Sequence, residues 1–318
     1  MTDSTERELD ESRNERDDSG PDRATYSREE AMQIARHRAL APRAIYEVIN
    51  LEGREEIKRP LSSLWWSGIA AGVGISSSIL AEGILHTIFS NHPYQGPIEN
   101  MGYTIGFILV ILGRIQLFTE NTITVVLPVL KDKSLSLFGC AARLWAVVFA
   151  ANLVGTFFVA LLTTHGGTVP PEYVEGMKAI SHHFAEYSWV EALRYGAPAG
   201  FFIAAVVWML PSSEGFEIFV IFLFTYLIAM GGFTHVVAGS NEAFILWLSG
   251  DITAAKCWFG LILPSFVGNV IGGTGLFALL AYGQVKAEIE QQTDAHKEEE
   301  KRDRENGARA NMQGQPGE

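Results

Sequence analysis

The charge pattern of this chain of 318 residues excludes an ordinary two-domain soluble enzyme. It carries 24 basic and 36 acidic residues, a net charge of −12, which does not favour nucleic acid as a partner because nucleic acid binds basic surfaces. Only 19 of the charged residues fall within 61–283, about 9% of that segment, whereas soluble domains average roughly 25%. The sequence therefore predicts a polytopic membrane protein with charged, water-exposed tails.

Composition divides the chain into four segments. They are a disordered acidic tail, a cytoplasmic amphipathic helix with a linker, a six-helix transmembrane domain and a charged cytoplasmic tail, at 1–26, 27–60, 61–283 and 284–318. The tails are too polar to bury a core. Ser27 followed by Glu30 is a capping box, which predicts a helix of about 20 residues from that point.

Six apolar segments recur within 61–283, and a membrane-spanning helix needs roughly 17–25 residues. They lie at about 64–89, 102–130, 137–163, 194–210, 216–249 and 257–282. The polar runs LFTENT and FTHVVAGSN interrupt the second and the fifth. In lipid, irregular backbone must line a cavity or pack against protein, because every backbone polar group needs a partner. We therefore predict an all-α membrane fold in which spans two and five are broken.

Three landmarks repeat in the same order in the two halves of this domain. They are Gly-x-x-Ala-Gly at 68–72 and 196–200, a broken Phe-Thr at 118–119 and 233–234, and Asn-x-x-Gly at 152–155 and 269–272. Three spans per half give the halves opposite orientations, so the pattern predicts an inverted repeat of 3+3 helices whose broken helices mark a transport path. Chance similarity between helices rich in glycine and alanine is the alternative.

Basic residues near the ends of the spans predict the orientation in the membrane. They gather before span one, between spans two and three, and after span six, at Arg54, Lys58, Arg59, Lys131, Lys133, Arg143 and Lys286. The loop 90–100 has no lysine or arginine, and the loop 164–193 has only Lys178. Both termini are therefore expected in the cytoplasm.

The two breaks contain polar side chains that are costly in lipid and typical of function. His235 lies in the second break, and its imidazole can exchange a proton near neutral pH or donate an N–H to an anion. Thr119 lies in the corresponding place of the first break, where its hydroxyl can donate to a substrate. For both residues the alternative is hydrogen bonding to nearby backbone alone.

Four further residues occupy matched places in the halves. Phe118 and Phe233 flank the breaks, where two apolar side chains can form a constriction that resists hydrated ions, although plain packing is the alternative. For Asn152 and Asn269 we expect a structural role, bridging the backbone of the broken helices. The half-helices are expected to begin near Ile123 and Glu242 and to present free N–H groups to an anion.

Four charged candidates also lie near or within the spans: Glu82, Arg114, Glu120 and Glu242. Glu120 and Glu242 place carboxyl groups beside the two breaks. Glu82, Arg114 and Glu120 could neutralise one another, although a spacing of six residues does not put Arg114 and Glu120 on one helical face.

The motifs around the breaks resemble those of the formate/nitrite transporter family. They are Leu-Phe-Thr-x-Asn at 117–121, Gly-Phe-x-His-x-Val-Ala at 232–238, and the Asn-x-x-Gly of spans three and six. The resemblance covers nearly all of 61–283. It implies a homopentamer with one pore per protomer, an aquaporin-like arrangement of the six helices, and small monovalent anions such as formate, nitrite, hydrosulfide or short carboxylates as substrates.

The resemblance also implies roles for single residues. In the family, the residues matching His235 and Thr119 lie at a central constriction between two apolar rings, and the histidine pairs with the anion or delivers a proton to it. We place Phe118, Phe233 and Asn121 in the same substrate pathway, together with the carboxyl groups near the breaks.

This chain departs from the family pattern at several positions. Gln116 replaces an acid, Gly239 replaces an asparagine, and the loop before span four lacks the usual lysine of the outer vestibule. Glu120 and Glu242 add negative charge, and a vestibule with extra acid and no lysine attracts anions poorly.

The sequence therefore leaves three hypotheses for function. The first is a channel-like transporter of a small weak-acid anion, with protons, across a bacterial-type cytoplasmic (inner) membrane. The second is a pore for a neutral solute or a cation that uses Glu120 and Glu242, and the third is a membrane scaffold that works through the tails. Hydrolytic, phosphate-binding and zinc motifs are missing from the sequence, so we expect no enzyme, cofactor or metal. The expected partners are the substrate, protons, lipid and further copies of the chain.

Overall fold

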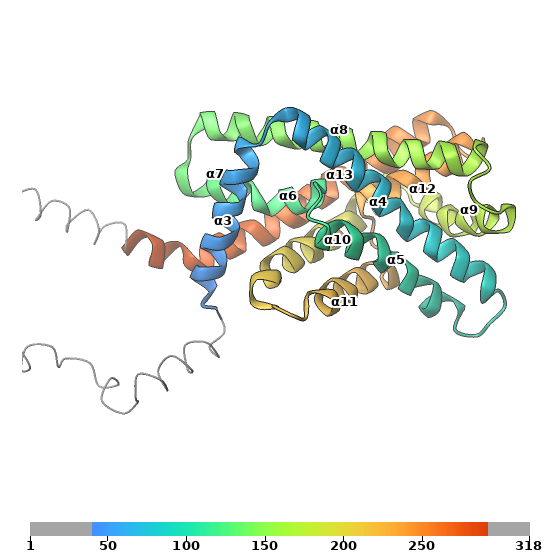
Figure 1. The fold of residues 1–318 in the computed structure, drawn as a ribbon, viewed down its shortest axis with the longest axis horizontal. Helices are drawn as coiled ribbons and strands as arrows, with labels where there is room; N and C mark the ends of the chain where they lie inside the picture. The colour runs from blue at the N-terminus through green and yellow to red at the C-terminus, as the bar shows by residue number, and fades with distance from the viewer. Residues whose placement is uncertain (1–39, 292–318) are drawn as a thin grey trace, which may run out of the picture. The chain divides into compact units, whose positions relative to one another are not determined.

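A computed structural model describes residues 40–291, and its regular structure there is entirely helical (Figure 1). The predicted tail 1–26, the capping box at Ser27 and most of the segment 284–318 lie outside the described residues. The helices are α3 (Pro42–Lys58), α4 (Leu61–Ile88), α5 (Gln95–Leu112), α6 (Phe118–Thr124), α7 (Val126–Asp132), α8 (Leu135–His165), α9 (Pro171–Glu186), α10 (Trp189–Met209), α11 (Glu217–Met230), α12 (Val236–Leu248) and α13 (Leu263–Val270). A 3₁₀ turn (Leu210–Ser212) follows α10, and two π-helical segments (Lys256–Ile262 and Ile271–Ala278) flank α13.

Four helical stretches of the described part are long and apolar enough to cross a membrane. They are Leu61–Ile88, Leu135–His165, Trp189–Ser212 and Lys256–Gln291. The second and fifth predicted spans are instead built from shorter helices, α5 with α6 and α11 with α12. This arrangement is consistent with six spans of which two are broken.

The breaks lie earlier in the chain than predicted. The non-helical stretches run between Leu112 and Phe118 and between Met230 and Val236. The polar run that follows the first break is helical, and its hydroxyl groups are satisfied by carbonyls of their own turn: the Thr122 hydroxyl donates to the Thr119 carbonyl (2.7 Å), for example. Each break contains one left-handed residue, Arg114 (φ 52°) or Gly232 (φ 61°).

Helix α3 differs from the helix predicted from Ser27 onward. Residues 40 and 41 are not helical, and α3 begins at Pro42. Proline is favoured in the first helical turn, and it pushes the preceding residue, Ala41, to extended backbone. We assigned 27–60 to a separate segment, but α3 packs against α6 and α7, so it is part of the helical body.

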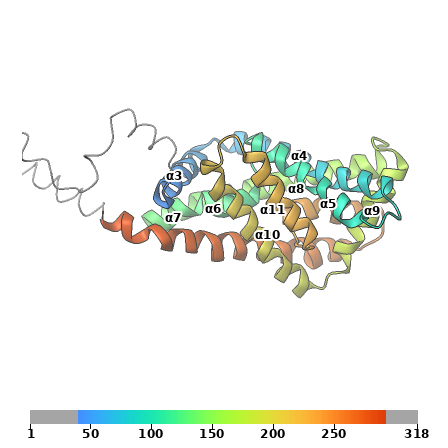
Figure 2. The ribbon, with the colours of Figure 1, turned by 90° about the horizontal axis from the view of Figure 1, so that it is seen from below.

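Helix α9 falls within 164–193, which was expected to be a loop. It packs against α4 and α12, and its buried face includes Met177 and Phe184. Figures 1 and 2 both place α9 and α3 toward opposite ends of the helical body. The paired helix breaks lie between these two helices.

Candidate functional site at the paired helix breaks

Asn152 of α8 holds the first broken span together. Its side-chain amide donates to the carbonyls of Gly68 and Gln116, both at 2.8 Å, and its side-chain oxygen accepts the N–H of Phe118 at 2.9 Å. One buried side chain thus satisfies two backbone groups of the break, the Gln116 carbonyl and the Phe118 N–H, and ties them to α4 through the Gly68 carbonyl.

Asn269 makes the same three bonds in the second half. Its amide donates to the carbonyls of Gly196 (2.9 Å) and Thr234 (2.8 Å), and its oxygen accepts the N–H of Val236 (2.8 Å). The half-helices therefore begin at Phe118 and Val236, not near Ile123 and Glu242 as predicted. These first N–H groups bond to asparagine and are not free for an anion.

The asparagine bonds fix the register of the inverted repeat. They match Gly68 with Gly196, Gln116 with Thr234, Leu117 with His235, and Phe118 with Val236. The predicted pairing of the two Phe-Thr sequences is therefore wrong, because Phe118 does not match Phe233. The two Phe-Thr sequences look alike, but only the hydrogen bonds to asparagine define equivalent backbone positions.

His235 and Thr119 meet across the two halves of the protein. The Nε2 atom of His235 lies 2.7 Å from the Oγ1 atom of Thr119, and the two residues are 1% and 0% exposed. The Nδ1 atom of His235 accepts the backbone N–H of Ala238 at 3.2 Å and so caps α12. A nitrogen that accepts carries no proton, so Nε2 carries it and donates to Thr119. The imidazole is therefore neutral in this geometry, and the Thr119 hydroxyl proton remains available to another acceptor.

Two cavities approach this histidine–threonine pair. The α3 cavity, which α3 helps to line, has a volume of about 420 Å³, and the α9 cavity, which α9 helps to line, about 310 Å³. Leu117 lines the α3 cavity, whereas its repeat match, His235, lines the α9 cavity. The two cavities share no lining residue, and the buried Thr119 lies between them. The arrangement resembles two vestibules separated by a short closed section.

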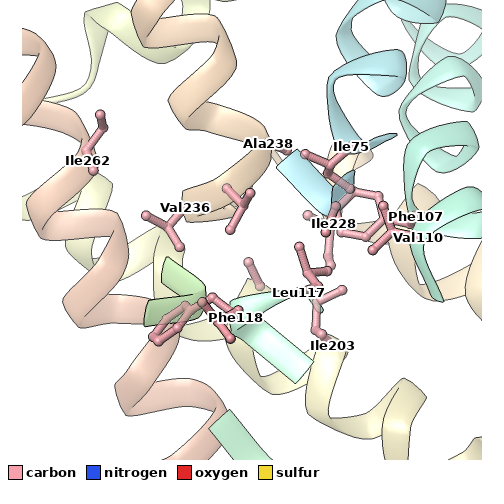
Figure 3. Packing of buried hydrophobic residues seen from close by; sticks show 14 of the residues in the cluster. Ile75, Phe107, Val110, Leu117, Phe118, Ile203, Ile228, Val236, Ala238 and Ile262 are labelled. Atoms are coloured by element: carbon pink, nitrogen blue, oxygen red, sulfur yellow. The ribbon is translucent and has the colours of Figure 1, made fainter. Parts of the chain in front are cut away.

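The apolar side chains at this closed section are not the expected pair. Phe233 lines the α9 cavity, but Phe118 lines neither cavity. The Phe118 ring packs instead on Phe149 and Phe266, with ring centroids 4.9 and 5.1 Å away. Figure 3 shows it across the cluster from Phe107. A helical turn directs successive side chains to different sides, so the first break presents Leu117 to the cavity and turns Phe118 away.

Phe107 is an apolar neighbour of His235 whose direction the sequence did not fix. Its ring is fully buried and meets the His235 imidazole edge-on, with centroids 4.9 Å apart. Nothing in the apolar run of α5 distinguishes this residue from its neighbours. Leu117 was not assigned to the pathway, although it is the residue directly before Phe118 in the break motif.

The remaining predicted residues line the cavities. Glu120 and Asn121 line the α3 cavity, and Glu242 lines the α9 cavity. The Oε1 atom of Glu120 is buried and has no hydrogen-bond partner in the described part of the chain. Arg114 does not pair with it but with Glu52 of α3, at 2.9 Å. Within residues 40–291 no group of histidine, cysteine and carboxyl side chains is arranged to hold a metal ion.

Comparisons with known proteins agree with this architecture. The family model for the formate/nitrite transporter matches residues 43–283. The inner membrane protein YfdC of Escherichia coli (strain K12) is 37% identical over 246 residues, covering 77% of this chain and 79% of that protein.

Two solved structures share the fold. A pentameric formate channel with formate bound is 21% identical with a TM-score of 0.58, over 71% of this chain and 98% of that one. An FNT family ion channel is 20% identical with a TM-score of 0.65, over 76% and 98%. These comparisons confirm the predicted all-α membrane fold and the resemblance noted in the sequence. This chain therefore belongs to the formate/nitrite transporter family.

Proposed function

We propose that this protein is a channel-like transporter of a small monovalent weak-acid anion of the formate or nitrite type, and that the anion crosses together with a proton. The observation that carries the proposal is the buried contact between His235 and Thr119, made across the two broken spans and between two cavities. Broken helices at equivalent places in an inverted repeat are where transporters bind substrate.

The closed section favours passage without net charge. Phe107 packs edge-on against His235, and Leu117, two residues before Thr119, is also buried and apolar. A bare charge is costly in such surroundings. The neutral His235 offers its N–H only to Thr119, whose hydroxyl can in turn donate to the substrate. In this proposal the proton arrives with the substrate, and the hydroxyl guides the resulting neutral acid.

The assembly is part of the proposal. Residues 61–283, together with α3, form the transport unit of one protomer, and five protomers assemble in a bacterial-type inner membrane with both termini in the cytoplasm. The family and the pentameric relative support the assembly, and the YfdC relative supports the membrane. The bias in lysine and arginine supports the orientation.

The test is uptake of labelled formate, nitrite and lactate into proteoliposomes at two outside pH values. Uptake by the wild type should rise about tenfold for each unit of outside acidification, because a carboxylic acid with a pKa near 4 is almost wholly ionised at neutral pH. Uptake that does not change with pH would contradict passage with a proton.

Two variants distinguish a role in transport from the role of His235 in capping α12. His235→Asn keeps a good N-cap for α12 but removes the imidazole N–H, and Thr119→Val removes only the hydroxyl. Both should lower uptake about tenfold, the equivalent of one buried hydrogen bond, while the oligomer keeps its size. As a control, Thr164→Val alters a hydroxyl near the end of α8 and should leave uptake unchanged. Full activity in both pathway variants would remove the pair from the path.

A further inference from the structure

The α9 cavity is lined by carboxyl groups and by no lysine or arginine. Three glutamates line it: Glu82, Glu99 and Glu242. Glu99 is paired, because its carboxylate lies 2.7 Å from the Nδ1 atom of His86. Glu82 and Glu242 have neither a hydrogen-bond partner nor an ion-pair partner within residues 40–291. The cavity therefore holds two carboxyl groups that the protein itself does not satisfy.

Of these two carboxyl groups, Glu82 is the stronger evidence for a ligand in the cavity. It lies inside the long helix α4 and is only 7% exposed, and a buried carboxyl group without a partner costs free energy. Close helix crossings fix it in place. Gly102 of α5 packs against the backbone at Ala81 and Glu82, and Gly83 packs against Met177 of α9. These crossings hold the Glu82 carboxyl group at the cavity wall, where a ligand in the cavity can be its partner.

Three basic side chains near the cavity are bound elsewhere. Lys178 and His182 both lie near Asp251, at 3.6 and 3.4 Å. The amino group of Lys256 donates to the carbonyl of Tyr187 at 2.6 Å. None of these three residues lines the cavity, and the basic residues that do are two histidines, His183 and His235. Because no lysine or arginine faces the three carboxyl groups, the lining favours cations over anions.

Aromatic rings complete the lining. Tyr103, Phe184, Tyr187 and Phe233 all contribute to the cavity wall, and burial raises the pKa of the Tyr187 hydroxyl, which therefore stays neutral. Aromatic faces attract ammonium-type cations, with methylated ammonium groups as the well-known case. A bare metal ion suits this site poorly, because the described residues place no three ligating side chains together for a metal.

We infer that the α9 cavity is a binding site for a small monovalent cation of the ammonium or methylammonium class. Glu82 and Glu242 supply the negative charge, the Tyr103 hydroxyl an acceptor, and the rings the apolar wall. This inference goes beyond the proposed anion transport and does not rest on it.

The experiment measures charge displacement in proteoliposomes of the full chain on a solid-supported membrane. A concentration jump of methylammonium chloride, with sodium chloride at equal ionic strength as the reference, should give a saturable positive displacement. Glu82→Gln and Glu242→Gln should each raise the half-saturating concentration about tenfold or more, as expected when one partner of a buried charge pair is lost.

Glu172→Gln is the matched control. It changes an exposed glutamate of α9 that does not line the cavity, and it should leave the displacement unchanged. If one cavity variant fails to assemble, Tyr103→Leu gives a second test of the same wall. Equal displacement by sodium and methylammonium, or a displacement that both glutamate variants leave unchanged, would overturn the inference.

Parallel uptake of labelled formate keeps the two proposals apart. Formate uptake without methylammonium displacement refutes the cation site alone. Methylammonium displacement without uptake of any anion refutes the proposed anion transport alone and leaves the cation site standing.

Discussion

At the scale of the residue, the single imidazole ring of His235 caps a helix and joins the two broken spans. Its Nδ1 atom caps α12 through Ala238 while its Nε2–H meets Thr119. A second proton on the ring would bring an N–H against the N–H of Ala238 and break the cap. The neutral imidazole is therefore a consequence of helix capping, and it makes His235 a poor proton donor in this conformation.

The two bridging asparagines give a stability prediction. Asn269→Leu removes the partners of the Val236 N–H and the Thr234 carbonyl in the break and the tie to Gly196 of α10, and each unpaired buried group costs about 1–3 kcal/mol. We expect a clear fall in the melting temperature of the purified protein, and the same for Asn152→Leu. Asn241→Leu is the graded comparison, because the Asn241 side chain donates only to the Thr156 carbonyl. If Asn269→Leu melted like the wild type, the bridge would not be needed to hold the break.

At the scale of the element, the helices cross at matched glycines. Gly72 of α4 packs against the backbone of Asn152, and Gly200 of α10 packs against the backbone of Asn269. These contacts bring each asparagine close enough to reach the break. Small residues at the crossings are thus required by the bridges, in addition to allowing tight packing in the membrane.

A pair of glycine substitutions tests this reading. In Gly200→Ala the added methyl group meets backbone atoms that cannot rotate away, so we expect a loss of about 1–3 kcal/mol and a smaller yield of assembled protein. Gly139→Ala, in α8, faces open space and should stabilise its helix by about 0.5–1 kcal/mol. Thermal unfolding of both variants in the same detergent measures the contrast. A Gly200→Ala protein as stable as Gly139→Ala would contradict the proposed close crossing.

Helix α3 is joined to the segment after the first break by polar contacts. The Arg54 guanidinium makes two bonds to Asp132, at 2.7 and 2.8 Å, and hydrogen bonding to Asp132 raises the pKa of Arg54. Burial raises the pKa of Tyr46, so its hydroxyl stays protonated and donates to the Leu127 carbonyl. These contacts make α3 a wall of the α3 cavity.

At the scale of the whole molecule, the inverted repeat places matched residues in opposite cavities. Gln116 and Asn121 line the α3 cavity, and their matches Thr234 and Gly239 line the α9 cavity. The two halves of the repeat therefore supply matched residues to the walls of the two cavities. The charges of the entrances are not those expected for attracting an anion, because glutamates outnumber basic residues in both linings.

Cysteine labelling tests the orientation of this arrangement. A cysteine at Tyr94, in the exposed turn before α5, should react with an impermeant maleimide on intact cells. A cysteine at Lys133, in the turn between α7 and α8, should react only after permeabilisation. The native thiols interfere little, because Cys257 is buried and Cys140 is half-buried, and replacing both with alanine gives the control. The reverse labelling pattern would place the α9 cavity in the cytoplasm.

The sequence by itself determined the family, the all-α membrane fold and the broken second and fifth spans. These features are encoded locally: apolar length predicts a span, a polar interruption predicts a break, and glycine and asparagine mark the crossings. Even the identity of the bridging residues Asn152 and Asn269 could be read from their matched spacing. Features of this kind need no knowledge of what lies opposite them in space.

Only the tertiary structure decided which side chains face the path. Side-chain direction turns by about 100° per helical residue, so the start of α6 at Phe118 turns that ring away and presents Leu117. The meeting of Thr119 with His235, 116 residues later, depends on both half-helices being held by their asparagines. Glu82 lines a cavity only because α5 and α9 pack beside it. No single segment of the sequence defines that cavity.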